Sequence, residues 1–324
     1  MSNKVLKPKK ASLYQFTQKY SNNIDNCIEF FKSMKWPEGF SCDRCGCHKY
    51  YLVKRVGKTK TSYVLECSSC HKQHSLLSGT IFQSCKIDLN KLLLGIFLFF
   101  NENKGISAVD LCSILDVYYK TALLLENKCR ILMSLSNSDK LLNSPFYEAD
   151  VFNIGAKYKY KAGRASEQQP ILGILSTDKE NNYPRFIKLR VITDYTGLSL
   201  KKNIEKCCVL SHDALLNTDG EKGFNTLNEE IQVKNEKISY EEKDHRLLWL
   251  NIIIGNIKNN ITGIYHGITK REMPLFLNEQ EYRFNHRKMG KTIMDKIKKY
   301  LQRSFPISHR QIVYILNISA PHFS

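Results

Sequence analysis

Two pairs of cysteines near the N-terminus constrain the fold of this chain more than any other feature of its sequence. The first pair is Cys42 and Cys45, the second is Cys67 and Cys70, and 21 residues separate the pairs. A C-x-x-C turn directs two thiolates to one point, so two such turns offer the four ligands of a closed tetrahedral site. A redox dithiol needs only one pair. The pattern therefore favours structural Zn²⁺ at a spacing close to that of a zinc ribbon.

The segment between the cysteine pairs is expected to form a β-hairpin, with Gly57 at its turn. It carries basic residues together with Tyr50, Tyr51 and Tyr63, a mixture that contacts DNA phosphates and stacks on bases, although a solvated basic hairpin would have the same composition. The candidate DNA contacts on this hairpin are Lys54, Arg55, Lys58 and Lys60.

Other cysteines and histidines do not extend this pattern. Four thiolates complete the site, so we expect Cys47, His48, His71 and His74 to be bystanders. The remaining cysteines lie in apolar surroundings, where a free thiol behaves as a small buried apolar group. These are Cys27, Cys85, Cys112, Cys129, Cys207 and Cys208.

The positive charge of the chain is concentrated at its two ends. The formal net charge is +18, of which residues 1–80 carry +9, residues 287–324 carry +7 and the long middle carries +2. Basic ends around a nearly neutral middle indicate a catalytic or packing core with extensions that bind nucleic acid, although a generally lysine-rich protein remains an alternative. The longest apolar run, 92–100, is too short to span a bilayer, and no apolar signal segment follows Met1. We expect a soluble, intracellular protein.

Residues 87–135 have the periodicity of helices, with Ser107 as a candidate N-cap. A short helix, a turn at 115–117 and a longer helix that carries Tyr119, Lys120, Lys128 and Arg130 resemble a helix-turn-helix, although any helical hairpin would give the same pattern. Lys120 is the DNA contact that we predict on this second helix.

After Pro145 the period changes to two, which predicts consecutive strands that begin with 146–154. Asp150 lies on this strand and Asp219 at the end of a later one, followed by a helix expected at 245–261. Asn251 and Lys258 are seven residues apart on that helix and so share a face. Oxygen ligands from two strands and a helix could hold Mg²⁺ or Mn²⁺, although isolated aspartates at strand ends usually form turns.

These residues together resemble the bacterial insertion-sequence DDE transposases that carry an N-terminal zinc ribbon, of the ISXO type and related to the eukaryotic Merlin elements. The resemblance covers roughly residues 28–290 and depends on many motifs in the same order. They are Phe40–Cys45, Cys67–Cys70, Leu77–Phe82, Ile106–Ala108, Tyr119–Ala122, Asp150 with Gly155, Ile171–Gly173, Asn217–Gly220, Trp249–Asn251, Lys258, Thr262–Gly267 and Tyr282–Arg287.

The resemblance implies an RNase H-like core in which Asp150, Asp219 and a third residue bind catalytic Mg²⁺ or Mn²⁺. In much of the family the third residue is Glu, and in one branch it is Asn with Lys seven residues later, as in Asn251 and Lys258. An amide oxygen is a weaker ligand than a carboxylate, so DNA phosphate would help to complete the metal shell. Lys258 would offset phosphate charge.

The chain departs from the family pattern after the first acid, where Asp-Glu-Thr is frequent and this chain has Asp150-Val-Phe. Glu148 could be a local substitute or an exposed polar residue, and we favour the second interpretation. Tyr265 and His266 could contact the site or form a helix end. Arg283 and Arg287 are interpreted as phosphate contacts rather than as participants in the chemistry.

The sequence thus predicts a multidomain α+β protein with five parts. They are an N-terminal helical arm (1–36), a zinc ribbon (37–80), a helical DNA-binding segment (81–142), an RNase H-like α/β catalytic core (143–288) and a basic C-terminal tail (289–324) that either binds DNA or keeps the protein soluble. We expect a transposase that acts on double-stranded DNA as a homo-oligomer. The alternative is a catalytically decayed or recruited DNA-binding protein, which Asn251 and the missing Glu motivate.

Overall fold

The computed structural model describes residues 11–57, 60–137, 141–155, 168–178, 183–235, 247–287 and 293–319. The chain divides into two compact units. The first unit contains residues 1–135 and 288–312, and the second contains residues 136–287 and 313–324. Among the described helices none is both long and apolar enough to cross a lipid bilayer.

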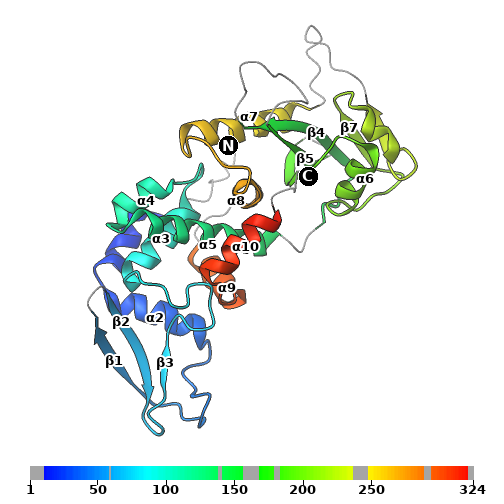
Figure 1. Ribbon diagram of the computed structural model, residues 1–324. Coiled ribbons are helices and arrows are strands. Elements are labelled where there is room, and N and C mark those ends of the chain that lie inside the picture. The colour runs from blue at the N-terminus through cyan, green and yellow to red at the C-terminus, as the bar shows by residue number, and fades with distance from the viewer. Residues whose placement is uncertain are drawn as a thin grey trace, which may run out of the picture. The chain divides into compact units, whose positions relative to one another are not determined.

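The first unit contains the predicted hairpin as part of a three-stranded antiparallel sheet (Figure 1). Strands β1 (Tyr50–Val56) and β2 (Thr61–Cys67) pair in a register that sets Tyr50 opposite Cys67, and β3 (Gln73–Ser75) pairs with β2. This register brings the chain that leaves the first cysteine pair next to the start of the second. The hairpin prediction is confirmed.

Helices make up the rest of this unit, and their apolar faces form its core. Leu92, Leu93, Ile96 and Phe97 of α3 are buried, as their spacing of three and four residues predicts. The helical segments are α1 (Leu13–Phe16), a π-helical turn η1 (Thr17–Ser21), α2 (Ile24–Lys35), α3 (Leu89–Asn101), α4 (Ala108–Leu115), α5 (Tyr119–Asn137), α9 (Ile293–Arg303) and α10 (His309–Ser319), of which α5 and α10 extend into the second unit.

Helix α9 is packed against the N-terminal helices. The ring of Tyr300 stacks on Phe100 of α3 at a centroid distance of 6.1 Å, and the Lys298 ammonium donates to the Ser33 hydroxyl of α2 at 3.1 Å. The backbone N–H of Ile81 donates to Ser304 Oγ at 3.1 Å. Residues of the predicted C-terminal tail thus contribute to the core of the first unit.

The second unit contains a five-stranded mixed sheet in the order β6-β5-β4-β7-β8. Strands β4, β5 and β6 form an antiparallel meander, whereas β7 pairs parallel to β4 and β8 pairs parallel to β7. The strands are β4 (Phe146–Ile154), β5 (Gln169–Thr177), β6 (Pro184–Val191), β7 (Leu215–Thr218) and β8 (Gln232–Asn235).

Different helices cover the two faces of this sheet. Alternate side chains of each strand point to opposite faces and therefore pack against different helices. Tyr147 and Ala149 of β4 pack with α6 (Gly197–Glu205) and the 3₁₀ helix η3 (Lys222–Leu227). Phe152 and Ile154 pack with α7 (Leu248–Gly263) and α8 (Met273–Asn285). By the same alternation, Glu148 and Asp150 belong to the α7 face. The chain is a multidomain α+β protein, as predicted.

Candidate metal centres and nucleic-acid interface

The four predicted zinc ligands converge in the first unit. The thiol sulfurs of Cys42 and Cys70 are 3.6 Å apart, those of Cys45 and Cys67 are 3.5 Å apart, and all four lie within 4.8 Å of one another. A tetrahedral Zn²⁺ site with bonds of ~2.3 Å has sulfurs separated by about 3.8 Å. The observed separations fit that tetrahedron, and the donor set is that of a closed structural zinc site.

Both cysteine turns have the same backbone design. The N–H of Gly46 donates to the carbonyl of Cys42 at 2.8 Å, and the N–H of His71 donates to the carbonyl of Cys67 at 3.0 Å. Gly46 and His71 each follow the second cysteine of a pair and have positive φ angles of 70° and 55°. The chain thus reverses after each pair, which leaves both thiols of the pair on the same side of the turn.

The surroundings of Cys42 favour its thiolate form. Burial raises the pKa of the Cys42 thiol, but the backbone N–H groups of Arg44 and Cys45 and the side chains of His74 and Cys70 outweigh it and lower that pKa to about 6. His74 is buried beside Cys42, with Nδ1 3.8 Å from a carboxylate oxygen of Asp43. His74 therefore adjoins the cluster and supports it.

Of the two predicted catalytic acids in the second unit, Asp150 lies on β4 and Asp219 directly follows the neighbouring strand β7. In the parallel pairing of β4 with β7, Ala149 lies opposite Thr218, so the next residues, Asp150 and Asp219, lie side by side on the α7 face. Burial and the negative charge of Asp219 raise the pKa of Asp150 to about 6. The pKa of Asp219 is also raised, through partial loss of water and the charge of Glu221.

Helix α7 runs along the same face and carries the other two predicted residues. The Lys258 ammonium lies 5.7 Å from the ring centroid of Phe152, and its charge opposes the rise in the pKa of Asp150. Asn251 is exposed and is the fourth residue of the helix, about two helical turns before Lys258. Asp150, Asp219 and Lys258 are therefore brought together, and Asn251 lies on the helix that covers them.

The interpretation of Glu148 as an exposed polar residue is wrong. Glu148 is only 2% exposed, and its carboxylate accepts a hydrogen bond from the backbone N–H of Leu250 at 2.9 Å. Burial raises its pKa to about 7, with the Leu250 N–H opposing the rise. Periodicity identified the face of the strand, but it could not reveal that α7 covers this position.

A cavity of about 730 Å³ adjoins Lys258 at the end of β4. Its lining includes Asn153, Ile154, Lys258 and His266, the last with a positive φ of 52° just after the end of α7. Tyr265 packs elsewhere, since its hydroxyl donates to Glu279 at 2.5 Å. The Tyr-His sequence thus forms a helix end, with His266 beside the cavity.

The predicted DNA contacts differ in how they present their charge. Lys54, Arg55 and Lys120 are exposed, and Lys58 lies outside the described residues. The Lys60 ammonium donates to the carbonyl of Cys85, which ties the hairpin to the segment before α3. Only the exposed members of this set are free to approach a phosphate in this conformation.

Arg283 and Arg287, the other two predicted phosphate contacts, differ in their exposure. The Arg283 side chain is 6% exposed and pairs with the buried carboxylate of Glu279 at 2.7 Å. Arg287 donates to the carbonyls of Pro184, Arg185 and Phe284. The guanidinium of Arg283 is therefore held within α8 and is not presented to DNA, whereas Arg287 is exposed while it also connects the chain after α8 to β6.

The α4–α5 hairpin has the compact turn of a helix-turn-helix. Ser107 caps α4 through a hydrogen bond from the Asp110 N–H at 3.1 Å, as predicted, and Asp116 reverses the chain with a φ of 48°. Lys128 donates to the Ile81 carbonyl at 2.5 Å and Arg130 pairs with Glu126, so neither reaches the surface. Tyr118 is 88% exposed at the start of α5, beside the exposed Lys120.

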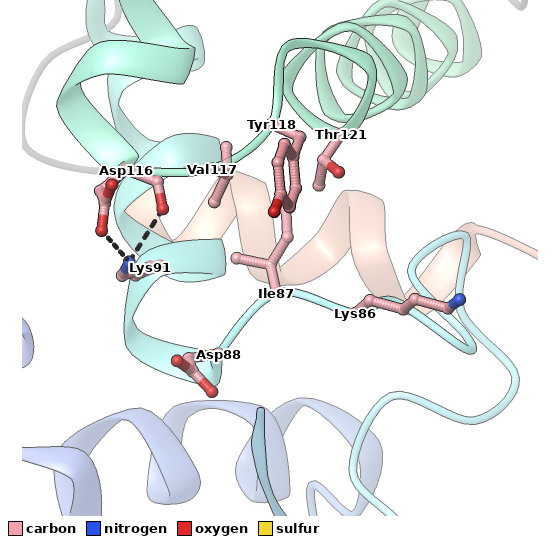
Figure 2. Close-up of a pocket in the computed structure, with 8 residues that line it drawn as sticks. All are labelled: Lys86, Ile87, Asp88, Lys91, Asp116, Val117, Tyr118 and Thr121. Carbon is pink, nitrogen blue, oxygen red and sulfur yellow. Dashed lines mark hydrogen bonds and ion pairs between the residues drawn. The ribbon is translucent and has the colours of Figure 1, made fainter. Parts of the chain in front are cut away.

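Figure 2 shows that Tyr118 and Thr121 stand at one side of a cavity of about 660 Å³, with Ile87 below the Tyr118 ring. Lys91 binds the carbonyl and carboxylate of Asp116 at 3.1 and 3.5 Å. Lys86 extends along the rim away from this pair. Tyr118 and Lys86 were not singled out from the sequence, because neither belongs to a motif, and only their exposure beside the turn draws attention to them.

Comparison with protein families agrees with both units. The ISXO2-like transposase domain matches residues 144–285, which contain the five-stranded sheet with α6, α7 and α8. The transposase zinc-ribbon domain matches residues 23–73, which contain α2 and the cysteine pairs. No curated protein matches the chain. The two family matches, with the zinc ribbon preceding the transposase domain along one chain, are those of an IS1595-type DDE transposase with an N-terminal zinc ribbon.

Proposed function

We propose that this transposase binds the terminal inverted repeats of its insertion sequence, cleaves DNA strands at the element ends and joins them to target DNA. The observation that carries the proposal is the proximity of Asp150 and Asp219, which directly follow the paired residues Ala149 and Thr218 and of which Asp219 acts electrostatically on Asp150. The pKa of both carboxyl groups is raised, that of Asp150 partly by the charge of Asp219, so a cation would stabilise their ionised forms. The match to a transposase domain indicates that the substrate is DNA.

In this proposal Asp150, Asp219 and Asn251 hold Mg²⁺ or Mn²⁺. Carboxylate and amide oxygens are hard ligands that suit these ions. Among the residues that the structure describes, Lys258 is the cation that acts on Asp150, and an acid pair in these surroundings fits a divalent ion. Bound divalent ions would activate the attacking oxygen and stabilise the leaving oxygen of a phosphodiester. Lys258 then attracts the phosphate backbone and limits repulsion between DNA and the two acids.

We also propose that residues 143–288 form an RNase H-like catalytic core. The support is topological: an antiparallel meander of three strands continues across a helix into two strands that are parallel to the first. The first acid lies on the central strand and the second at the end of its parallel neighbour. This arrangement is the one that the resemblance implies for the two acids.

DNA recognition is assigned to the first unit. The exposed residues Lys54 and Arg55 on β1 and Tyr118 and Lys120 at the start of α5 offer phosphate contacts and aromatic surface. The N-terminal residues of the second helix are those that reach base edges in a helix-turn-helix. Two element ends must be brought together for joining, so we propose that the protein acts as a homo-oligomer on DNA.

The test is a strand-cleavage and strand-transfer assay with the zinc-loaded full chain. The substrate is DNA that carries the ends flanking the gene, with Mg²⁺ or Mn²⁺ added and with Asp219→Ala as the matched control. Metal-dependent nicking that is absent from the control supports the transposase. The alternative is a decayed or recruited DNA-binding protein, which Asn251 and Val151 favour. Binding of the ends without cleavage in either metal would support that alternative.

A further inference from the structure

The buried carboxylate of Glu148 has no role in the chemistry proposed above. It lies in the middle of the α7 face of β4, where the carboxylate oxygen Oε1 has no hydrogen-bond partner among the residues that the structure describes. Oε2 accepts the hydrogen bond from Leu250. A buried acid with one unpaired oxygen destabilises the fold, and a leucine would fill the same space without that penalty. The position therefore invites a functional explanation.

The partner of Glu148 is the beginning of α7. The first backbone N–H groups of a helix have no carbonyl within the helix to accept them, and α7 has Leu247 at its N-cap, without a side-chain hydrogen bond. Leu250 is the third residue of the helix, and its N–H is one of these unpaired groups. Glu148 supplies the missing acceptor at this end of the helix.

This hydrogen bond fixes where α7 starts along β4. Glu148 is two residues before Asp150 on the same strand face, and Leu250 is directly before Asn251 on the helix. One contact thus connects the strand that carries the first acid with the turn that carries the third predicted ligand. The charge that raises the pKa of Asp150 comes from Asp219, not from Glu148.

Resting on the function proposed above, we propose that Glu148 is a positioning residue that holds the first turn of α7 and so places Asn251 over the Asp150–Asp219 pair. Asn251 needs such support because a neutral amide is not drawn to a cation by charge. Its position must therefore be fixed by the scaffold. Glu148 acts through the Leu250 N–H and does not itself contact the metal or DNA.

The experiment compares Glu148→Leu, which removes the acceptor, with Glu148→Gln, which keeps an acceptor oxygen at the same reach. Glu148→Asp, one methylene shorter, serves as a second disrupting variant if the leucine variant does not fold. Glu281→Gln is the matched control, because Glu281 is also fully buried in the second unit but pairs with Lys188 and Arg190 instead of α7. All variants are tested as the zinc-loaded full chain.

Two readouts do not depend on catalysis. Hydrogen exchange in the peptide spanning Leu250 reports the hydrogen bond, and calorimetric titration reports Mn²⁺ binding. We expect Glu148→Leu to lose protection at Leu250 and to weaken Mn²⁺ binding about tenfold or more, whereas Glu148→Gln stays within about threefold of wild type. A third readout is the metal dependence of cleavage, which the leucine variant should shift to higher Mn²⁺ concentration.

The outcomes separate this proposal from the proposed function. If the wild type binds Mn²⁺ but never cleaves, the transposase activity fails while the exchange and Mn²⁺ results still decide the role of Glu148. Unchanged Leu250 protection and unchanged Mn²⁺ binding in Glu148→Leu would overturn the positioning role. Equal losses in the leucine, glutamine and Glu281→Gln variants would also overturn it, because they would indicate a general structural effect.

Discussion

The zinc ribbon and the acidic site bring ligands together by different means. In the ribbon, four cysteines come from two short turns, and each turn directs its own pair through local hydrogen bonds. In the second unit, Asp150 and Asp219 are distant in sequence and meet only because β7 pairs parallel to β4 in one register. A site whose ligands are neighbours in sequence can be recognised from the spacing of those ligands. A site whose residues meet through strand pairing can be recognised only when the order and register of the strands are known.

The largest expected effect concerns the locally encoded site. Replacing Cys67 with Ser should abolish zinc binding and unfold the ribbon, since structural zinc contributes on the order of 10 kcal/mol to small domains. Zinc analysis and hydrogen exchange across β1 and β2 measure this. The second unit should keep its protection. Collapse of both units together would show that the two sites are not independently encoded.

The next effect concerns the site encoded by topology. Asp150→Ala and Asp219→Ala should each reduce strand cleavage by about a thousandfold or more, because residues that act as one unit fail together. Binding of element-end DNA, measured by fluorescence anisotropy, should stay within about threefold. The double variant should be no worse than either single one. Additive losses would indicate that the two acids work separately.

A smaller effect is expected in stability. The pKa of Asp150 is raised from its usual 3.8 to about 6 in the folded state, so the fold loses stability as the pH rises from about 4 to about 6, and the full loss persists above pH 6. Without added Mg²⁺ or Mn²⁺, Asp150→Asn should be more stable than wild type at pH 8 by about 2 kcal/mol. Thermal unfolding at pH 8 and pH 4 tests this, with most of the difference lost at the lower pH, where Asp150 is largely protonated in both the folded and the unfolded states. A constant difference would contradict the assignment.

The smallest effect separates exposed from occupied basic residues. Lys120→Ala should weaken DNA binding severalfold and reduce the slope of log affinity against log salt by about one. Lys60→Ala should leave that slope nearly unchanged, because its ammonium is held by the Cys85 carbonyl. Salt titrations of DNA binding distinguish the two variants. Equal slopes for both would argue against the exposed end of α5 as a DNA contact.

Much of the fold follows from the sequence. Cysteine spacing predicted the ribbon, apolar periodicity predicted α3, α4 and α5, and alternation predicted β4 with Asp150 on the same face as Glu148. The predicted helix from 245 is observed as α7 from Leu248, with residue 247 the first described before it. Each of these features depends on residues that are close together in the sequence, so the spacing of residue types is enough to predict it.

The remainder depends on partners that are distant in sequence. Arg283 and Lys128 have the residue type of DNA contacts, but buried Glu279 and the Ile81 carbonyl hold them. Glu148 is polar and was therefore placed at the surface, whereas α7 covers it. A basic or acidic residue shows its charge in the sequence but not its partner, so each of these assignments required the tertiary structure.

The claim that Asp150 and Asp219 form one metal site is tested most directly by calorimetric titration of Mn²⁺ into the zinc-loaded wild type, Asp150→Asn, Asp219→Asn and the double variant. We predict that each single variant weakens Mn²⁺ binding about tenfold or more and that the double variant adds little, since both carboxylates serve the same ion or ion pair. Wild-type Mn²⁺ affinity in either single variant would contradict the shared site.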